Sequence, residues 1–290
     1  MDWGNRRERF RAHLEGDSCV TMASVHDALA GRIAEDLGFE VGTITGSSAS
    51  LAVLGDPDHM LITLSEFAQQ IMRVSRACSL PLMVDGDDGY GNALNVMRAV
   101  EELETAGVAA ITIEDTVLPR PFGSSGAGTM RSIEEGVGRL RAALAARQDS
   151  RLVIAGRTPA ITFSTLDDAI ARCVAYEKAG VDAIFLGGPT CREQIEAVSA
   201  ALSVPLFLGG NGYEAALYDL PYLASQRVRL SSQGHMPIRA AIQATYDTLK
   251  ALRDGVNPKA LPGIASGELL AQVTRAGEYA RRTKDFLGGT

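Results

Sequence analysis

Residues 81–91 read Pro-Leu-Met-Val-Asp-Gly-Asp-Asp-Gly-Tyr-Gly, a short apolar run that ends in three carboxylates within four residues. An amphipathic stretch, Ala93–Ala106, follows, and after Gly107 comes a second apolar run, Ala109–Ile113. Glycine is favoured just beyond a helix C-terminus because the backbone there takes up left-handed angles. The segment therefore predicts a strand, a helix and a second strand parallel to the first.

The same alternation runs through most of the chain. Eight apolar runs predict strands: Val20–Ala23, Val41–Thr45, Leu82–Val84, Ala109–Ile113, Leu152–Ala155, Ala183–Leu186, Leu206–Leu208 and Val228–Leu230. Amphipathic stretches between them predict helices: His26–Leu37, Leu64–Ala77, Ala93–Ala106, Ile133–Arg147, Leu166–Ala179 and Arg192–Leu202, with a short seventh interval at Glu214–Ala224. Eight such units without a Pro/Ser/Gly-rich linker predict an α/β fold, a single (β/α)8 TIM barrel over residues 1–290; two doubly wound domains are the alternative.

A C-terminal extension, residues 256–290, follows a long predicted helix, Ile238–Arg253. The extension holds a further predicted helix, Glu268–Phe286, which has no place in a closed barrel. We therefore expect it to pack on a neighbouring subunit and the protein to form a homo-oligomer.

Composition limits the partners of the chain. The 290 residues carry a net charge of −7 with both signs interleaved, which argues against nucleic acid as a partner. The N-terminus shows no apolar signal segment, and no apolar run approaches the ~18 residues of a membrane span. Four scattered cysteines indicate reduced thiols rather than zinc ligands or disulfides. We expect a cytoplasmic protein.

The carboxylates Asp85, Asp87 and Asp88 have two interpretations. A buried strand that ends in clustered carboxylates must neutralise them, and a hard divalent cation such as Mg²⁺ takes oxygen ligands. A polar loop followed by a helix N-cap is the other interpretation, because Asp and Gly are common turn residues.

Polar residues also follow the other predicted strands. Gly46, Ser47 and Ser48 follow strand two, where free N–H groups could cradle a carboxylate or simply form a turn. The remaining strand-end residues are Glu114 and Asp115 after strand four, Arg157 after strand five, and His235 after strand eight. In a barrel these positions share one rim, so carboxylates for a cation, an arginine for an anion and a histidine for proton transfer converge there.

A long loop, Thr116–Met130, follows strand four and is called the lid loop below. Its Gly and Ser content suggests a mobile segment that excludes water. The spacing of Gly123 and Gly128 is similar to that of a phosphate loop, but Thr129 stands where such a loop needs lysine. Nucleotide binding is therefore excluded.

The chain resembles the isocitrate lyase/phosphoenolpyruvate mutase superfamily. The resemblance runs from about Cys19 to beyond His235 and rests on four segments: residues 85–92, 113–119, 55–63 and 157–158. It implies a (β/α)8 barrel whose C-terminal helix is swapped between subunits in a dimer of dimers, a homotetramer. It also implies Mg²⁺, with Mn²⁺ as an alternative, bound directly by Asp85 and through waters by Asp58, Asp87 and Glu114. Substrates are α-keto or α-hydroxy carboxylates held by Mg²⁺, by the backbone around Gly46 and Ser47, and by Arg157.

The lid loop separates members of the superfamily. Carbon–carbon lyases carry a catalytic Cys and a His where this chain has Phe122 and Ser124, and phosphonate-cleaving members carry Asn at the Cys position. The oxaloacetate decarboxylase branch resembles this chain, with an apolar Phe in the lid, a Ser at Ser47 and a Gly-His pair at Gly234-His235. Pro159, and Gly86 and Asp88 within the acidic motif, depart from the usual pattern.

This resemblance implies an enzyme, a Mg²⁺-dependent carboxy-lyase that converts oxaloacetate to pyruvate and CO₂ through a metal-stabilised enolate. Asp85, Arg157 and His235 are the expected catalytic residues, and His235 either contacts the substrate or helps to deliver a proton. The alternatives are a carbon–carbon lyase similar to 2-methylisocitrate lyase, or a hydrolase, acting on another α-keto or 2-hydroxy acid. A non-catalytic dicarboxylate sensor is a third.

Overall fold

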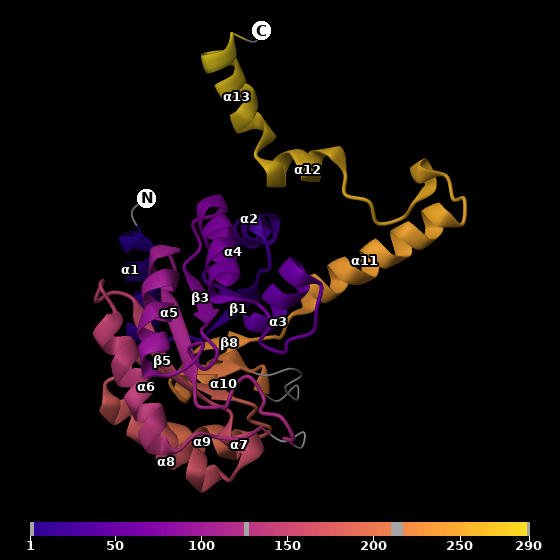
Figure 1. Ribbon diagram of the computed structural model, residues 1–290. Helices are drawn as coiled ribbons and strands as arrows, with labels where there is room; N and C mark the ends of the chain where they lie inside the picture. The colour runs from indigo at the N-terminus through magenta and orange to yellow at the C-terminus, as the bar shows by residue number, and fades with distance from the viewer. Residues whose placement is uncertain (1–2, 125–127, 210–216, 289–290) are drawn as a thin grey trace.

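The computed structural model describes residues 3–124, 128–209 and 217–288. Eight strands form one closed parallel barrel in the order in which they occur along the chain, and β8 pairs with β1 (Figure 1). The strands are β1 (Val20–Ser24), β2 (Gly42–Ile44), β3 (Leu82–Asp85), β4 (Ala110–Glu114), β5 (Val153–Thr158), β6 (Ala183–Gly187), β7 (Leu206–Gly209) and β8 (Val228–Ser232). The predicted (β/α)8 barrel is confirmed.

The helices that cover the barrel lie close to their predicted positions. They are α2 (Ala28–Asp36), α4 (Leu64–Ala77), α5 (Ala93–Thr105), α6 (Ile133–Ala146), α8 (Leu166–Ala179), α9 (Arg192–Ala200) and α10 (Leu220–Ser225). The helix α11 (Met236–Arg253), which projects away from the barrel (Figure 1), also lies close to its predicted position. The start of the predicted seventh interval, residues 214–216, lies outside the described residues. Local sequence explains several helix ends: Thr63 and Glu66 form a capping box at α4, and Gly180 ends α8 in left-handed geometry.

Four parts of the helical structure differ from the sequence-based expectation. The helix α1 (Gly4–Glu15), the segment of α3 (Gly46–Ala49) with the π-helical turn η1 (Ser50–Leu54), and the short α7 (Ala160–Phe163) were not predicted. The predicted single C-terminal helix is wrong: α12 (Gly267–Thr274) and α13 (Ala276–Leu287) are separate. Arg275 interrupts them because its φ of 62° is left-handed and cannot continue a right-handed helix.

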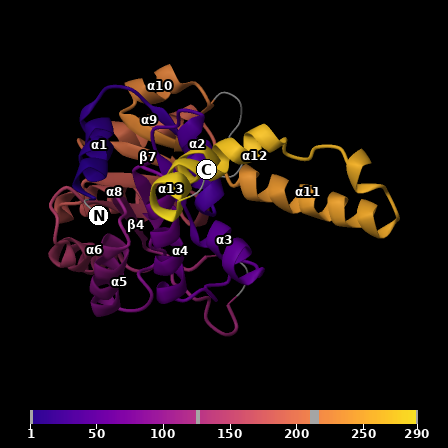
Figure 2. The same ribbon diagram turned by 90° about the horizontal axis from the view of Figure 1, so that it is seen from above.

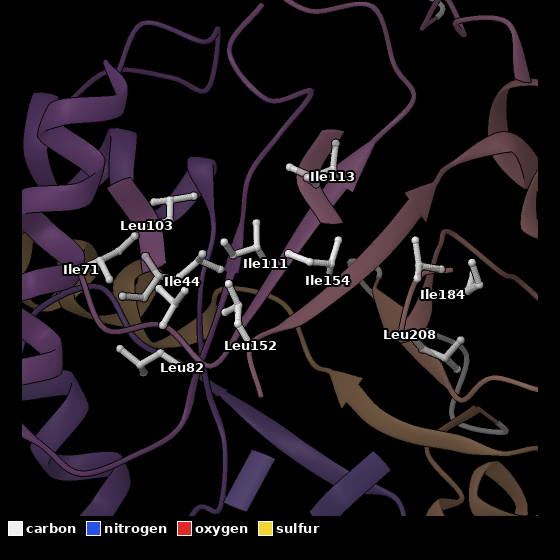
Figure 3. Packing of buried hydrophobic residues seen from close by; sticks show 14 of the residues in the cluster. Ile44, Ile71, Leu82, Leu103, Ile111, Ile113, Leu152, Ile154, Ile184 and Leu208 are labelled. Carbon is white, nitrogen blue, oxygen red and sulfur yellow. The ribbon is translucent and has the colours of Figure 1, made fainter. Parts of the chain in front are cut away.

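Buried apolar side chains fill two regions. The larger one lies between the strands and the surrounding helices, where Ile71 of α4 and Leu103 of α5 meet Leu82 and Ile111 of the barrel wall (Figure 3). The smaller one lies inside the barrel and includes Met83, Phe185, Phe207 and Leu230.

The helix α1 covers the N-terminal mouth of the barrel. Its Phe10 is fully buried among the interior residues and meets the Phe207 ring edge-on at 6.0 Å between centroids. Arg7 donates to the Val108 carbonyl at 3.0 Å, and Arg11 donates to the Arg151 carbonyl at 2.9 Å, so both bind the backbone just before β4 and β5. The opposite mouth, at the carboxyl ends of the strands, stays open for a site.

The C-terminal part of the chain leaves the barrel. The helix α11 projects outward, and the chain passes through the 3-10 turn η3 (Pro258–Ala260) and returns through α12 toward α2 (Figures 1 and 2). Arg275 forms an ion pair with Asp36 of α2 at 2.7 Å, and Arg32 donates to the Val273 carbonyl at 3.3 Å. The extension therefore contacts its own barrel at α2; no residue of α13 is buried. No helix within the described ranges is long and apolar enough to cross a membrane.

Candidate active site

Three of the predicted site residues come together at the carboxyl ends of β3, β4 and β5. The parallel register places Glu114 beside Arg157, and Arg157 forms ion pairs with both Asp85 and Glu114, its Nε lying 3.0 Å from Glu114 Oε2. Thr112 of β4 also donates to Asp85 Oδ1 at 3.3 Å. The carboxylates thus surround a single guanidinium at the centre of the rim.

Asp87 completes this acidic group through its backbone as well as its side chain. Its N–H donates to Asp85 Oδ1 at 3.1 Å, and its carbonyl accepts from the Glu114 N–H at 2.8 Å. Its carboxylate lies against Gly46, where a Cβ atom would come 3.1 Å from Asp87 Oδ2. A side chain at position 46 would therefore push on this carboxylate, so the glycine permits the close approach.

The electrostatics of this group favour a cation. Burial, together with the neighbouring charges of Asp85 and Glu114, raises the pKa of Asp87 well above its usual range. Burial also raises the pKa of Glu114, although Arg157 opposes the shift. Asp87 Oδ2 is buried and has no hydrogen-bond partner. These are the features of a site that is deprotonated and satisfied when a divalent ion binds.

The donor set fits a hydrated ion. Within the described part of the chain, no three His, Cys, Asp or Glu side chains converge closely enough to ligate one ion together. The residues at the rim, Asp85, Asp87 and Glu114, supply carboxylate oxygens, the type of donor that Mg²⁺ takes. Asp58 is exposed and accepts a hydrogen bond from Ser47 Oγ at 2.6 Å, at the edge of the same group.

Not every predicted side chain lines the site. Ser48 is fully buried, and its hydroxyl donates to the Thr45 carbonyl at 3.1 Å as part of the cap of α3. Asp88 and Asp115 form ion pairs with arginines at the barrel wall instead of joining Asp85 and Asp87. The acidic motif is thus divided between two environments.

His235 is held by two hydroxyl groups that the sequence analysis missed. Ser24 Oγ lies 3.0 Å from Nδ1 of the ring, and Thr45 Oγ1 lies 3.2 Å from Nε2. Burial lowers the pKa of His235, against the opposing effect of Asp85. The sequence did contain a signal for Ser24, because it is a polar residue at the end of β1. The predicted site drew on the ends of other strands and did not include the end of strand one.

Two adjacent cavities open at this rim and share Ser47, Asp85, Arg157 and Pro159. One, of about 240 Å³, reaches His235 and Phe185; the other, of about 470 Å³, contains Asp87 and Glu114 and lies under the lid loop. The ends of the lid loop are joined by the Val117 N–H, which donates to the Thr129 carbonyl at 2.8 Å. Phe122 is fully exposed, and residues 125–127 of the lid lie outside the described ranges.

A closed (β/α)8 barrel with an acidic, arginine-bearing pocket at the carboxyl ends of its strands defines the class of protein. A sequence model of the phosphoenolpyruvate phosphomutase family matches residues 10–253. The chain belongs to this family, part of the phosphoenolpyruvate mutase/isocitrate lyase superfamily, as the sequence resemblance implied.

Relatives and solved structures match nearly the whole chain. It is 56% identical to the oxaloacetate decarboxylase of Bradyrhizobium sp. (strain ORS 278) and 55% identical to that of Rhodopseudomonas palustris (strain BisB18), over 99% of each chain. The phosphoenolpyruvate phosphomutase of Streptomyces platensis subsp. rosaceus superposes with a TM-score of 0.86 at 28% identity, over 97% of this chain and 99% of that one. A phosphonopyruvate hydrolase in complex with oxalate and Mg²⁺ superposes with a TM-score of 0.83 at 28% identity, over 97% of this chain and 98% of that one.

Proposed function

We propose that this protein is a Mg²⁺-dependent carboxy-lyase that converts oxaloacetate into pyruvate and CO₂. One observation carries the proposal: proteins named oxaloacetate decarboxylase match 99% of the chain at 54–56% identity. The pocket supports it, because it joins a cation-seeking acidic group to an arginine suited to a carboxylate.

Each of the site residues then has a role. Asp85 would bind Mg²⁺ directly, and Asp87, Glu114 and Asp58 would bind its waters; Mn²⁺ is the alternative ion. When bound, the ion supplies Lewis-acid stabilisation of the negative charge that develops on the keto oxygen. The residues of the chain orient the substrate and supply the proton that the product takes up.

Arg157 and His235 act on the substrate itself. The planar guanidinium of Arg157 would bind a substrate carboxylate through two hydrogen bonds, and the backbone at Gly46 and Ser47 would hold it from the other side. His235, held by Ser24 and Thr45, would contact the substrate or, after taking a proton from solvent, deliver the proton that carbon takes up after CO₂ leaves. No thiol is needed for this reaction, which agrees with Phe122 in the lid.

The proposal is tested by an assay across substrates. Purified protein is expected to release pyruvate from oxaloacetate when Mg²⁺ is present, and EDTA should stop the reaction. Cleavage of 2-methylisocitrate, or hydrolysis of another α-keto acid, at a higher kcat/KM than for oxaloacetate would instead establish the lyase or hydrolase alternative. Binding of oxalate without turnover of any keto acid would establish a sensor.

Metal binding is expected to stabilise the fold in a pH-dependent way. Because Asp87 and Glu114 have raised pKa values without the ion, Mg²⁺ must displace their protons, so its affinity falls as the pH falls through those values. At a hundredfold excess over Kd the ion adds about 2.7 kcal/mol, or roughly 5 °C in Tm. Thermal unfolding with and without Mg²⁺ should show this rise near about pH 8 and a smaller one near about pH 5. Equal rises at both pH values would contradict the assignment.

A glycine that lines the pocket, Gly209, is expected to control the position of Arg157. The Phe185 ring lies 5.5 Å from the guanidinium, and a Cβ atom at Gly209 would come 2.1 Å from that ring. Gly209→Ala should therefore move the ring toward Arg157 and lower kcat/KM for oxaloacetate by about 100-fold. Gly138→Ala is the control, because a Cβ there meets no atom within 4 Å. Similar kinetics for the two variants would contradict this coupling.

We also propose that the 290 residues act as one barrel domain that assembles into a dimer of dimers, with the extension over residues 256–290 exchanged between subunits. The apolar residues Ile242, Tyr246 and Leu249 support the assembly, because they recur along one face of α11 and are at least half exposed. The exchange is supported by α13, none of whose residues is buried against its own barrel. Light scattering should give the mass of four chains; a monomer would contradict the assembly.

The free cysteines support a reducing compartment, the cytoplasm.

A further inference from the structure

The Asp88 carboxylate lies outside the acidic pocket although it directly follows Asp87. Only 1% of its side chain is exposed, and its Oδ2 atom is 2.7 Å from Nη2 of Arg131. Arg139 donates to the Asp88 carbonyl, and the Tyr90 N–H donates to Asp88 Oδ1 at 3.1 Å. The negative charge of Asp88 is thus balanced by Arg131 on the outer side of the loop after β3.

Arg131 also binds the residue that follows Glu114. Its N–H donates to the Asp115 carbonyl at 2.7 Å, and its own carbonyl accepts from Arg172 Nη1 at 2.8 Å. The same Arg172 atom lies 2.9 Å from Asp115 Oδ2, and the hydroxyl of Tyr176 donates to that oxygen as well. Main chain and side chains together thus hold the end of β4 from outside the pocket.

Arg131 therefore connects the two loops that carry the pocket carboxylates. One link runs through Asp88 to Asp87, and the other runs through Asp115 to Glu114. The residues of the lid loop next to it are joined across its base, where Thr116 pairs with Met130. One residue thus contacts both loops, with its side chain at Asp88 and its main chain at Asp115, beside the base of the lid.

The arrangement also separates charges. Asp88 and Asp115 form ion pairs with Arg131 and Arg172, neither of which lines the two cavities, whereas Arg157 lines both cavities and pairs with Asp85 and Glu114. Without Arg131 the buried Asp88 carboxylate would be left with the longer ion pair to Arg139, at 3.8 Å, and without Arg172 Asp115 would lose its ion pair. The loops would then have to move to hydrate the two carboxylates. That movement would change the positions of Asp87 and Glu114.

We propose that Asp88 and Arg131 form a positioning pair that holds Asp87 and Glu114 at the spacing required for a hydrated divalent ion. Neither residue touches the ion or the substrate. The inference rests on the proposed metal site, but not on the identity of the substrate. It assigns Asp88, which follows the pocket carboxylates in sequence, to support of the site rather than to ligation.

Mn²⁺ binding to the full-length protein tests this directly, measured as loss of the free Mn²⁺ signal in electron paramagnetic resonance. Asp88→Asn and Arg131→Gln should each raise the Kd for Mn²⁺ about 10- to 100-fold, the usual effect of removing groups that orient metal ligands. Arg131→Lys keeps the charge and should fold, but it cannot reach Asp88 and Glu135 together as Nη2 and Nη1 do. The Kd of Arg131→Lys for Mn²⁺ should therefore lie between those of the wild type and Arg131→Gln. Turnover of the variants should recover at high Mn²⁺ concentration.

Asp182→Asn is the matched control. Asp182 forms ion pairs with Arg11 at 2.9 Å and Arg147 at 2.7 Å, but it lies just before β6 at the opposite mouth of the barrel. It should lower Tm and leave the Kd for Mn²⁺ within about twofold of the wild type.

Two results would overturn the pairing role. One is a Kd for Mn²⁺ within twofold of wild type in Asp88→Asn and in both Arg131 variants, which would make the pair purely structural. The other is an equal loss of affinity in Asp182→Asn, which would mean general loosening. The wild type could bind Mn²⁺, with weaker binding in the variants, and yet not decarboxylate oxaloacetate. In that case the positioning role stands and the proposed function fails.

Discussion

Asp85→Asn is expected to lower kcat/KM for oxaloacetate by about 100-fold to 1,000-fold, the range for loss of one preorganised charge-stabilising group at an active site. Asparagine keeps the size of the side chain and can still accept the hydrogen bonds from Thr112 and the Asp87 N–H. The change therefore removes the charge without removing the packing. It should also abolish the rise in Tm that Mg²⁺ produces in the wild type.

Asp58→Asn provides the comparison for Asp85. Asp58 is exposed at the edge of the acidic group, so Asp58→Asn should lower kcat/KM for oxaloacetate by about tenfold. This is the lower end of the range for residues that act through waters. Steady-state kinetics over a range of Mg²⁺ concentrations measure both variants. Full activity of Asp85→Asn, with an unchanged response to Mg²⁺, would remove Asp85 from the proposed mechanism.

Phe10→Ala should lower the free energy of unfolding by about 3–5 kcal/mol, the usual cost of truncating a buried aromatic side chain. Phe10 is fully buried inside the barrel and forms an edge-to-face contact with Phe207, so its removal leaves a cavity at the N-terminal mouth. Denaturant unfolding followed by circular dichroism would measure the loss.

Phe122→Ala makes the same chemical change on the fully exposed lid phenylalanine and should leave the unfolding midpoint unchanged. Equal stability of the two variants would show that the mouth of the barrel can collapse around the missing ring. It would also show that α1 is held mainly by its arginine contacts with the backbone.

The sequence predicted the barrel well because the signals for it are local. Each strand is a short apolar run, each covering helix repeats its apolar positions along one face, and glycines such as Gly107 and Gly180 mark the ends. The helix α1 was not predicted because half of residues 4–15 are charged and the segment contains little apolar surface beyond Phe10 and Leu14. Its place depends on contacts with distant segments, made by the Phe10 ring inside the barrel and by Arg7 and Arg11 at the backbone before β4 and β5.

The candidate site was predictable to the same extent. Asp85, Glu114 and Arg157 come directly at strand ends, and parallel strands bring their carboxyl ends to one rim, so position in the sequence was sufficient. By itself the sequence thus determined the barrel and the residues that meet at its rim.

Only the tertiary structure decided the direction of neighbouring side chains. Asp87 faces the pocket and Asp88 faces Arg131, although both belong to one acidic run. Ser24 and His235 meet across 211 positions of the chain because β1 closes the barrel against β8. The physical reason is that strand and helix periodicity is encoded by near neighbours, whereas the partner of a buried charge or ring is set by contacts between distant segments.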